Sequence, residues 1–429
     1  MIKRYLIMVI VILAIAVPAV WFFFIRDSEP PVITLSPDIE AVSKQKGFTL
    51  WSEDKGTGIL SVEVRAVQGT RKHVVLRKTY PSKPELVTEK FSLLKAPLKD
   101  GAITLEVEVM DGTTRNTALW SKVLTLDSKP PRITVKSRPP YVRQGGSSIV
   151  VYLLDEEPVS TGVMVGDLFF KGYKQANNEY YCFFAFPYYL KPGEYTPMLT
   201  ATDSVGNQRE NTLAVNALPR KFKNKTSKLS DAFFKKIIPE FEDTFPGITD
   251  PLEFFLKVNN ELRSANRRAL RKISRQTSSK MLWEGVFLRQ PRSATLAGFG
   301  DHRQYMFDGK VVDEQDHLGV DLASLRNAGV MASNSGKVVF VGKMGIYGRA
   351  IIIDHGLGLH SMYAHLSEIA VDKGQPVDKA QIIGKTGATG LAYGDHLHFA
   401  IIMGGLPVTP VEWWDKGWIE DNITGRITE

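Results

Sequence analysis

The spacing of hydrophobic residues changes along the chain, and each change marks a segment. An unbroken apolar run extends over residues 5–25. Between residues 27 and 217, apolar and polar residues alternate in short stretches, such as 103–109 and 148–153, with Gly and Pro between them. Because successive side chains of a strand point to opposite faces, this alternation predicts β-strands.

A helical period replaces the alternation beyond about residue 221. Ser230-Asp231 and Asp250-Pro251 predict helix starts, because Ser and Asp cap helices and Pro suits the first turn. The apolar residues that recur at helical spacing are Leu252, Phe255, Leu256, Leu262, Ala265, Ala269 and Ile273. Strands are predicted again after Phe287, at residues 336–341, 350–354, 382–384 and 396–402.

These patterns predict a mainly β protein with one helical segment. We expect five parts: an N-terminal anchor (1–26), two tandem β-sandwiches (27–126 and 127–217), a helical linker or regulatory segment (218–285) and a C-terminal all-β domain (286–429). The helical segment carries many Arg and Lys residues on its polar face. Two interpretations of residues 229–280 are open: a helix that simply packs on its neighbours, or an inhibitory element that covers a groove of the C-terminal domain.

The apolar run at the N-terminus is long enough to cross a bilayer as a helix. Lys3 and Arg4 precede it and acidic residues follow it, so the positive-inside rule places the N-terminus in the cytoplasm. A cleaved signal peptide is the alternative, but the apolar stretch continues through residues 21–24, which is long for a cleaved segment. We expect a single-pass anchor in the cytoplasmic membrane, through residues 5–25, with the bulk of the chain extracytoplasmic (periplasmic).

A repeat supports the two sandwiches. Asp27-Ser-Glu-Pro-Pro-Val-Ile-Thr-Leu35 reappears as Asp127-Ser-Lys-Pro-Pro-Arg-Ile-Thr-Val135. Units of about a hundred residues built from short strands are typical of β-sandwiches. The pattern resembles bacterial immunoglobulin-like domains, in which a strand that ends in Asp is followed by a Gly-Asn turn, as at Asp203. The units could serve as a spacer or bind partner proteins of the envelope.

The composition of the chain limits the classes of molecule that we expect it to bind. The formal net charge of +8 favours anionic surroundings, such as a membrane surface or an anionic polymer. No RNA- or DNA-binding motif is present, so we expect no nucleic acid partner. Cys182 is the only cysteine, which rules out an intrachain disulfide. Its aromatic neighbours predict a buried strand and an inert thiol.

The histidines supply the candidate chemistry, since seven of the eight fall between His302 and His398. His396 and His398 would point to the same side of a strand. His317 and Asp321 are four residues apart, but Gly319 and Val320 disfavour a helix between them, so a turn or strand end must bring them together.

Together His317, Asp321 and His398 offer two neutral nitrogens and one carboxylate. Three protein ligands with one open position are typical of a catalytic zinc site. His365 and His396 would remain for proton transfer or for stabilising developing charge.

Residues from about 298 to 415 resemble a LytM-type peptidase domain of the M23 family, the lysostaphin-like peptidoglycan endopeptidases. The motifs that carry this resemblance, in the family's order and at family-like spacing, are Phe299-Gly300 with Arg303, His317-Leu-Gly-Val-Asp321-Leu-Ala323, Asp354-His355-Gly356, Tyr363-Ala-His365-Leu-Ser367, Gly387-Ala-Thr-Gly390 and His396-Leu-His398-Phe399. The resemblance implies that His317, Asp321 and His398 bind Zn²⁺. It also implies that His365 and His396 assist catalysis, without saying which of the two is the base.

Other positions are open or depart from the family pattern. Arg303 is interpreted either as a contact for the substrate carbonyl or as half of a structural ion pair. Tyr393-Gly394-Asp395, Ala400 and His360 depart from the family's common residues. We expect His302, His355 and His360 to lie in turns or at the surface. A set of three aromatic residues is expected to pin the C-terminal tail to the core: Trp413, Trp414 and Trp418.

The function that these observations predict is a zinc metalloendopeptidase acting on peptide stems or cross-links of bacterial peptidoglycan. Some members of the family have lost site residues and act by activating amidases, whereas all five are present here. Two alternatives are open: a non-catalytic LytM-type regulator that activates another cell-wall hydrolase, and a scaffold that works through its sandwich domains. The bond that is cleaved and the oligomeric state cannot be read from the sequence.

Overall fold

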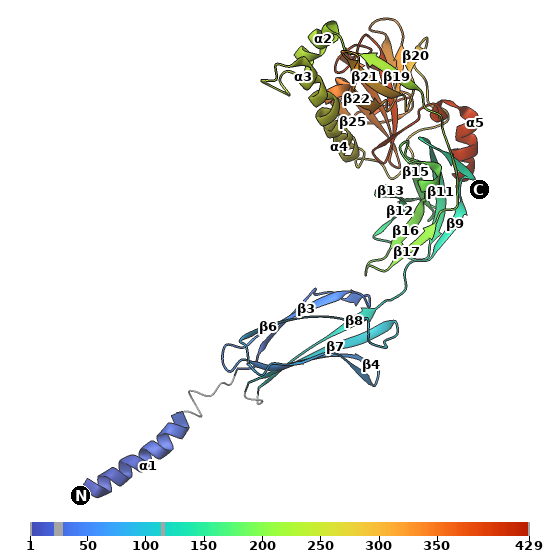
Figure 1. Cartoon of the computed structure of the whole chain (residues 1–429). Helices are drawn as coiled ribbons and strands as arrows, with labels where there is room; N and C mark the ends of the chain where they lie inside the picture. The colour runs from blue at the N-terminus through green and yellow to red at the C-terminus, as the bar shows by residue number, and fades with distance from the viewer. Residues whose placement is uncertain (1, 21–28, 113–115, 428–429) are drawn as a thin grey trace. The chain divides into compact units, whose positions relative to one another are not determined.

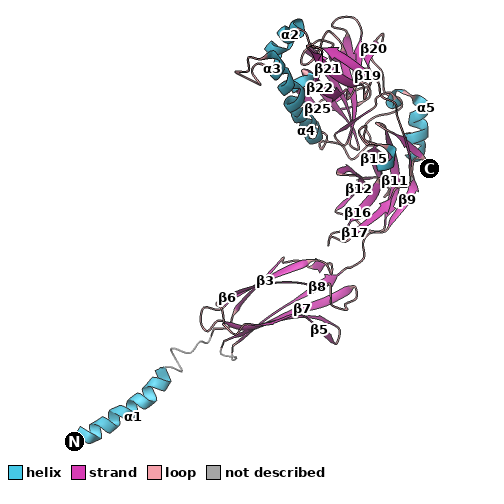
Figure 2. Ribbon diagram, in the orientation of Figure 1, coloured by secondary structure: helices cyan, strands magenta, loops and turns pink. Residues whose placement is uncertain are grey.

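The computed structural model describes residues 2–20, 29–112 and 116–427, and confirms a mainly β fold with a helical segment (Figures 1 and 2). The chain divides into two compact units. The first comprises Met1–Pro130 with Ser204–Asn207, and the second comprises Pro131–Asp203 with Gln208–Glu429.

The first unit begins with helix α1 (Ile2–Val20). The C-terminal part of the predicted membrane anchor, residues 21–28, lies outside the described residues. Of the helices in the described part of the chain, none combines the length and the apolar character needed to cross a membrane. The anchor therefore stays a prediction.

Two sheets of the first unit enclose one core. The three-stranded sheet has the order β1-β3-β6 and the five-stranded sheet β2-β8-β7-β4-β5. Their strands are β1 (Val32–Ser36), β2 (Ala41–Val42), β3 (Gly47–Glu53), β4 (Ile59–Gln68), β5 (Arg71–Thr79), β6 (Leu86–Ser92), β7 (Gly101–Asp111) and β8 (Thr117–Leu126). Buried residues alternate along β7, as the sequence pattern predicts, and its Leu105 and Val107 meet Phe48 and Leu50 of β3 in the same core.

The second unit starts with a second pair of sheets, ordered β14-β15-β11-β9 and β13-β12-β16-β17, with a short parallel pair β10-β18. Their strands are β9 (Ile133–Ser137), β10 (Tyr141–Arg143), β11 (Ser147–Leu154), β12 (Ser160–Val165), β13 (Leu168–Lys171), β14 (Tyr173–Lys174), β15 (Tyr180–Ala185), β16 (Met198–Thr202), β17 (Gln208–Thr212) and β18 (Asn216–Leu218). The immunoglobulin-like relationship of both pairs stays a prediction.

This second pair of sheets shares its core with the C-terminal part of the chain. Trp413 is fully buried, and its ring lies 5.9 Å from that of Phe183 of β15 and 5.3 Å from that of Phe287. Trp414 stacks on Phe399 at 5.6 Å. The predicted role of the tryptophans is confirmed for these two, and the tail packs on both neighbouring parts of the unit.

Cys182 lies in the middle of β15 and is fully buried. Burial raises the pKa of its thiol to about 12. Since the thiolate is the reactive form, roughly one thiol in ten thousand is ionised near pH 8. We expect iodoacetamide to leave the native protein unmodified and to alkylate one thiol per chain after unfolding in guanidinium chloride, as measured by intact mass. Rapid alkylation of the native protein would contradict this burial.

Glu412 ties the tail to the second pair of sheets. Its carboxylate accepts hydrogen bonds from Arg220 at 2.6 Å and from the Ser147 amide at 3.2 Å, and the Arg220 and Glu412 side chains are 23% and 11% exposed. Glu412→Gln leaves the guanidinium without its counter-charge. Burial raises the pKa of Glu412 to about 7, so the ion pair is complete only above neutral pH. We expect the substitution to lower the free energy of unfolding by roughly 2–4 kcal/mol in urea titrations at pH 8 or above.

The matched control for this change is Glu420→Gln. Glu420 pairs with Lys416 at 3.6 Å, but both side chains are largely exposed. Such surface pairs contribute at most about 1 kcal/mol. Equal effects of the two substitutions would contradict a structural role for the buried pair.

Residues 224–228 of the predicted helical segment form a strand, β19, but the helical part begins where the sequence predicts a helix start, at Asp231. It consists of α2 (Asp231–Phe241), α3 (Pro251–Lys257), a π-helical turn η3 (Val258–Leu262) and α4 (Arg263–Ile273). The Ser230 and Asp250 side chains accept hydrogen bonds from the amides of Phe233 and Glu253.

The C-terminal part is built on an eight-stranded sheet with the order β20-β23-β31-β27-β26-β25-β29, and β32 pairs with β31. The same part of the chain contains two three-stranded sheets, with the orders β19-β21-β22 and β24-β30-β28. Their strands are β19 (Asn224–Lys228), β20 (Ala294–Ala297), β21 (His302–Phe307), β22 (Lys310–Asp316), β23 (Val320–Ala323), β24 (Gly329–Met331), β25 (Gly336–Lys343), β26 (Arg349–Gly356), β27 (Leu359–Leu366), β28 (Glu368–Ile369), β29 (Pro376–Val377), β30 (Ile382–Lys385), β31 (Leu397–Met403) and β32 (Leu406–Val408). The short helical pieces of the unit are η2 (Pro192–Glu194), η4 (Gly345–Tyr347), η5 (Glu412–Trp414), α5 (Lys416–Ile419), η6 (Glu420–Thr424) and α6 (Gly425–Ile427).

The central strands of the large sheet are buried on both faces. Every residue of β27 and β31 is buried. One set of their side chains, including Ala400, shares a core with Phe254 and Phe255 of α3. Ala400 is one of the positions that depart from the family pattern, and a small apolar residue suits its buried place beneath the helical segment.

Candidate metal centre

Three neighbouring strands bring the candidate residues together. Asp321 of β23 is the cross-strand partner of His398 of β31, and His398 in turn faces Ala364 of β27. His317 lies in the turn before β23, and His365 follows Ala364 near the end of β27. Residues far apart in sequence thus meet because β31 lies between β23 and β27.

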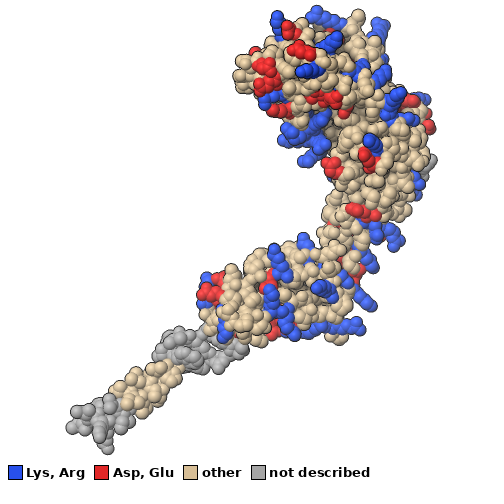
Figure 3. Space-filling view, in the orientation of Figure 1, with Lys and Arg blue, Asp and Glu red and all other residues tan. Residues whose placement is uncertain are grey.

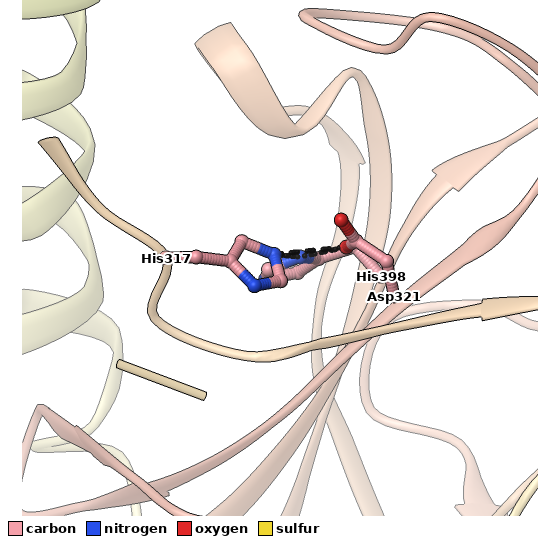
Figure 4. A group of neighbouring side chains, drawn as sticks. All are labelled: His317, Asp321 and His398. Atoms are coloured by element: carbon pink, nitrogen blue, oxygen red, sulfur yellow. Dashed lines mark hydrogen bonds and ion pairs between the residues drawn. The ribbon is translucent and has the colours of Figure 1, made fainter. Parts of the chain in front are cut away.

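The side chains of His317, Asp321 and His398 converge on one point (Figure 4). Asp321 Oδ1 lies 2.9 Å from His317 Nε2 and 2.9 Å from His398 Nδ1, and the two nitrogens are 3.1 Å apart. All three residues are buried. Donor atoms on a tetrahedral zinc ion with bonds near 2.0 Å are separated by about 3.3 Å. The triangle of donors therefore suits zinc in both chemistry and size.

Surrounding groups orient these donors. His317 Nδ1 donates to the Gly298 carbonyl at 2.8 Å, which leaves the lone pair of Nε2 free to bind a metal ion. Arg303 donates to the second carboxylate oxygen of Asp321 at 2.9 Å. Although burial opposes ionisation, the neighbouring imidazoles hold the pKa of Asp321 well below its usual value. Burial lowers the pKa of His398 to about 4, so its imidazole is neutral as a metal ligand must be.

His365 and His396 stand beside this triangle. Their ring centroids are 4.8 Å apart, and that of His365 is 5.7 Å from that of His398. His365 Nδ1 bonds to the Thr389 carbonyl and His396 Nδ1 to the Gly394 carbonyl, both at 2.8 Å. Each ring therefore keeps Nε2 for other chemistry.

The two rings differ electrostatically. Burial, together with His396 and His398, lowers the pKa of His365 well below its usual value. Burial is the largest single influence on His396 and lowers its pKa, but the Asp321 carboxylate and the Gly394 carbonyl together outweigh burial, so the pKa of His396 is raised. His365 also has a φ of 63°, a conformation that non-glycine residues adopt mainly where the surrounding structure enforces it.

A cavity of about 290 Å³ is lined by Arg303 and by the five predicted site residues, His317, Asp321, His365, His396 and His398. Tyr393, which departs from the family pattern, also lines it. Further lining residues were not singled out from the sequence: Lys225 and Ser227 of β19, Phe233 of α2, Arg263 of α4, and Tyr347. The helical segment thus forms part of the cavity wall, while the hypothesis that it inhibits stays a prediction. Only the arginine-rich pattern of α4 could have indicated its contribution.

The remaining histidines lie outside the cavity. His355 of β26 and His360 of β27 are fully buried, so their predicted placement in turns or at the surface is wrong. His355 bonds to the Ser335 carbonyl and the Ser361 hydroxyl, both at 2.7 Å, which lets the ring be buried. His302 is partly exposed on β21 and pairs with Asp316 at 3.0 Å.

Comparison with known proteins agrees with this geometry. Residues 315–410 match the model of peptidase family M23, and this range contains all five site residues. The chain carries a peptidase M23 domain. Arg303 and the helical segment lie outside the matched range of this M23 domain.

The M23 domain is similar to the corresponding parts of several named proteins. The DD-carboxypeptidase/endopeptidase Mpg of Neisseria meningitidis is 40% identical over 95 residues, which are 22% of either chain. The peptidoglycan DD-endopeptidase ShyB of Vibrio cholerae is 38% identical over 112 residues, 26% of either chain. The murein hydrolase activator NlpD of Salmonella dublin is 34% identical over 112 residues, 25% of this chain and 29% of NlpD. The match thus spans about a quarter of each relative.

Proposed function

We propose that this protein is a zinc-dependent endopeptidase that hydrolyses amide bonds in the peptide stems or cross-links of bacterial peptidoglycan. The observation that carries the proposal is the buried triangle of His317, Asp321 and His398, with two further imidazoles in the same cavity. The similarity of the M23 domain to Mpg and ShyB supports the reaction class and, through the name of ShyB, the polymer.

The residues of the cavity divide the chemistry between them. A zinc ion held by His317, Asp321 and His398 would polarise a carbonyl and acidify water. His365 and His396 have their Nδ1 atoms committed to backbone carbonyls, so each Nε2 can take up a proton or, once protonated, stabilise an oxyanion. Arg303 fixes the carboxylate of Asp321, and we assign it a second role as a contact for the substrate carbonyl.

We further propose that residues 1–26 anchor the chain in the cytoplasmic membrane and that its bulk lies in the periplasm, where peptidoglycan is accessible. In this arrangement the two pairs of sheets act as a spacer, or bind other envelope proteins. The apolar run of residues 5–25 and the basic residues before it support this location.

A regulator is the second candidate, because NlpD is named as an activator of murein hydrolases. A regulator needs the fold but not the metal or the catalytic imidazoles. The presence of all five site residues in one buried geometry favours the enzyme.

The direct test is incubation of purified full chain and Zn²⁺ with peptidoglycan, followed by chromatography and mass spectrometry of the muropeptides. We expect new uncross-linked or shortened peptides, whose masses identify the cleaved bond. If the purified chain by itself binds one zinc ion and yields no new peptide, the proposal that it is an enzyme is refuted. An increase in the rate of a second, added wall hydrolase would then establish the regulator.

A further inference from the structure

Arg263, at the start of α4, brings a positive charge to the cavity of the metal centre. Its side chain lines the cavity and is held by Asn259, whose carbonyl and side-chain oxygens accept at 3.2 and 2.7 Å. Asn259 is fully buried and is itself oriented by a bond of 2.7 Å to Asp313. The guanidinium is thus fixed in place by neutral groups.

The other charges of the cavity have partners. Lys225 pairs with Asp301 at 3.1 Å, and Arg303 with Asp321 at 2.9 Å. The Asp395 carboxylate accepts from the Thr386 hydroxyl and the Asn327 amide. In the part of the chain that the structure describes, no acidic side chain forms an ion pair with Arg263.

Arg267 repeats this situation one turn further along α4. It donates to the neutral Gln315 side chain at 3.3 Å, and its buried Nε has no hydrogen-bond partner among the described residues. Both guanidinium groups act on Tyr347: burial raises its pKa, and their charges oppose that rise. The ring of Tyr347 lies 5.4 Å from that of His398, and Tyr347 lines the cavity together with Arg263, whereas Arg267 is not among the residues that line it.

Such an arrangement costs stability. Like charges four residues apart on a helix repel, and a buried donor without an acceptor is not compensated for its lost hydration. Figure 3 shows that Lys and Arg side chains gather around α4. An anion that binds Arg263 in the cavity would offset the repulsion between the two charges, and guanidinium groups match carboxylates in geometry and charge.

We propose that Arg263, supported by Arg267, is a subsite for a carboxylate of the substrate close to the scissile amide. This inference rests on the proposed function and names its substrate class: peptides with a free carboxylate near the cleaved bond, either at the peptide's C-terminus or on a side chain. Because α4 lies outside residues 315–410, this selectivity comes from the helical segment and not from the matched M23 range.

The test uses a cross-linked muropeptide dimer in three forms: all carboxylates free, the terminal carboxylate amidated, and the side-chain carboxylates amidated. For the full chain, one amidated form should show a kcat/KM lower by roughly 10-fold or more, and it identifies the carboxylate that is bound. Arg263→Gln should lower kcat/KM for the free form by a similar factor, mainly through KM. It should not affect the form that has already lost the carboxylate, and Arg263→Lys should recover part of the loss.

The control is Arg268→Gln, an exposed change on the same helix. Equal losses on all three substrates in Arg263→Gln would assign Arg263 a purely structural role and overturn the proposal, as would no loss on any. If the full chain cleaves none of them, the proposed function fails, and equilibrium binding of the same dimers decides the subsite. A weaker Kd in Arg263→Gln for the free form alone supports it, and unchanged Kd values refute it.

Discussion

Replacing His317 with Ala is expected to abolish zinc binding and to lower the rate of hydrolysis of a cross-linked muropeptide by roughly 1,000-fold or more. Two of the three donor contacts in the site involve its Nε2, at 2.9 and 3.1 Å, so the substitution leaves one nitrogen and one carboxylate oxygen. A catalytic zinc site needs three protein ligands besides its open position, and the substitution leaves only two. Metal content by mass spectrometry and initial rates on the dimer measure the two effects.

The matched control is His302→Ala, since His302 is partly exposed, outside the cavity, and paired only with acidic residues of β22. It should bind one zinc ion and retain its rate. If His317→Ala also retained one zinc ion and its rate, the triangle would not be the metal site.

Removing either of the two unligated imidazoles should have a different signature. We expect His365→Ala and His396→Ala to keep one zinc ion per chain while kcat falls by roughly 100- to 10,000-fold. The reason is that each Nε2 is available for proton transfer, whereas neither ring belongs to the triangle of donors. The measurement is metal content together with kcat and KM on the same dimer.

The two substitutions have their own contradicting outcomes. Loss of zinc in His396→Ala would show that His396 is a ligand. This outcome is a real test because His396 Nε2 lies only 3.6 Å from Asp321 Oδ1. An unchanged kcat in both variants would remove the imidazoles from the mechanism. A double variant that loses no more than the stronger single one would indicate that the two rings act as one unit.

The sequence could identify the site because its chemistry is concentrated in a few residue types. His317, Asp321 and His398 are a recognisable donor set, and period-two alternation places His396 and His398 on one side. The sequence could not show that β31 lies between β23 and β27, because strand order depends on long-range pairing. This order is what places His365 beside the triangle.

Two histidines whose positions were predicted wrongly show that residue type alone does not predict burial. His355 and His360 were expected in turns or at the surface. Both are fully buried, and neighbouring carbonyl and hydroxyl groups satisfy their nitrogens. Which buried positions offer such partners is determined by the packing of β26 on β27, and no local pattern records it.

The helical segment shows the same limit at a larger scale. Its caps and apolar period predicted where helices form, and Ser230 and Asp250 cap them as expected. A period of 3.6 identifies an apolar face but not the surface that covers it. The apolar face of the helical segment contacts the sheet at Ala400, which accounts for the small apolar residue there. The same packing brings Phe233 and Arg263 to the cavity.

The most direct test of the metal centre is a zinc titration of the full chain after removal of metal with a chelator. Zinc occupancy and the rate of dimer hydrolysis would be measured on the same samples. We expect no hydrolysis without metal, and a rate that rises in proportion to occupancy and levels off at one zinc ion per chain. Full hydrolysis by the metal-free protein, or one bound zinc ion with no hydrolysis, would contradict a catalytic zinc site formed by His317, Asp321 and His398.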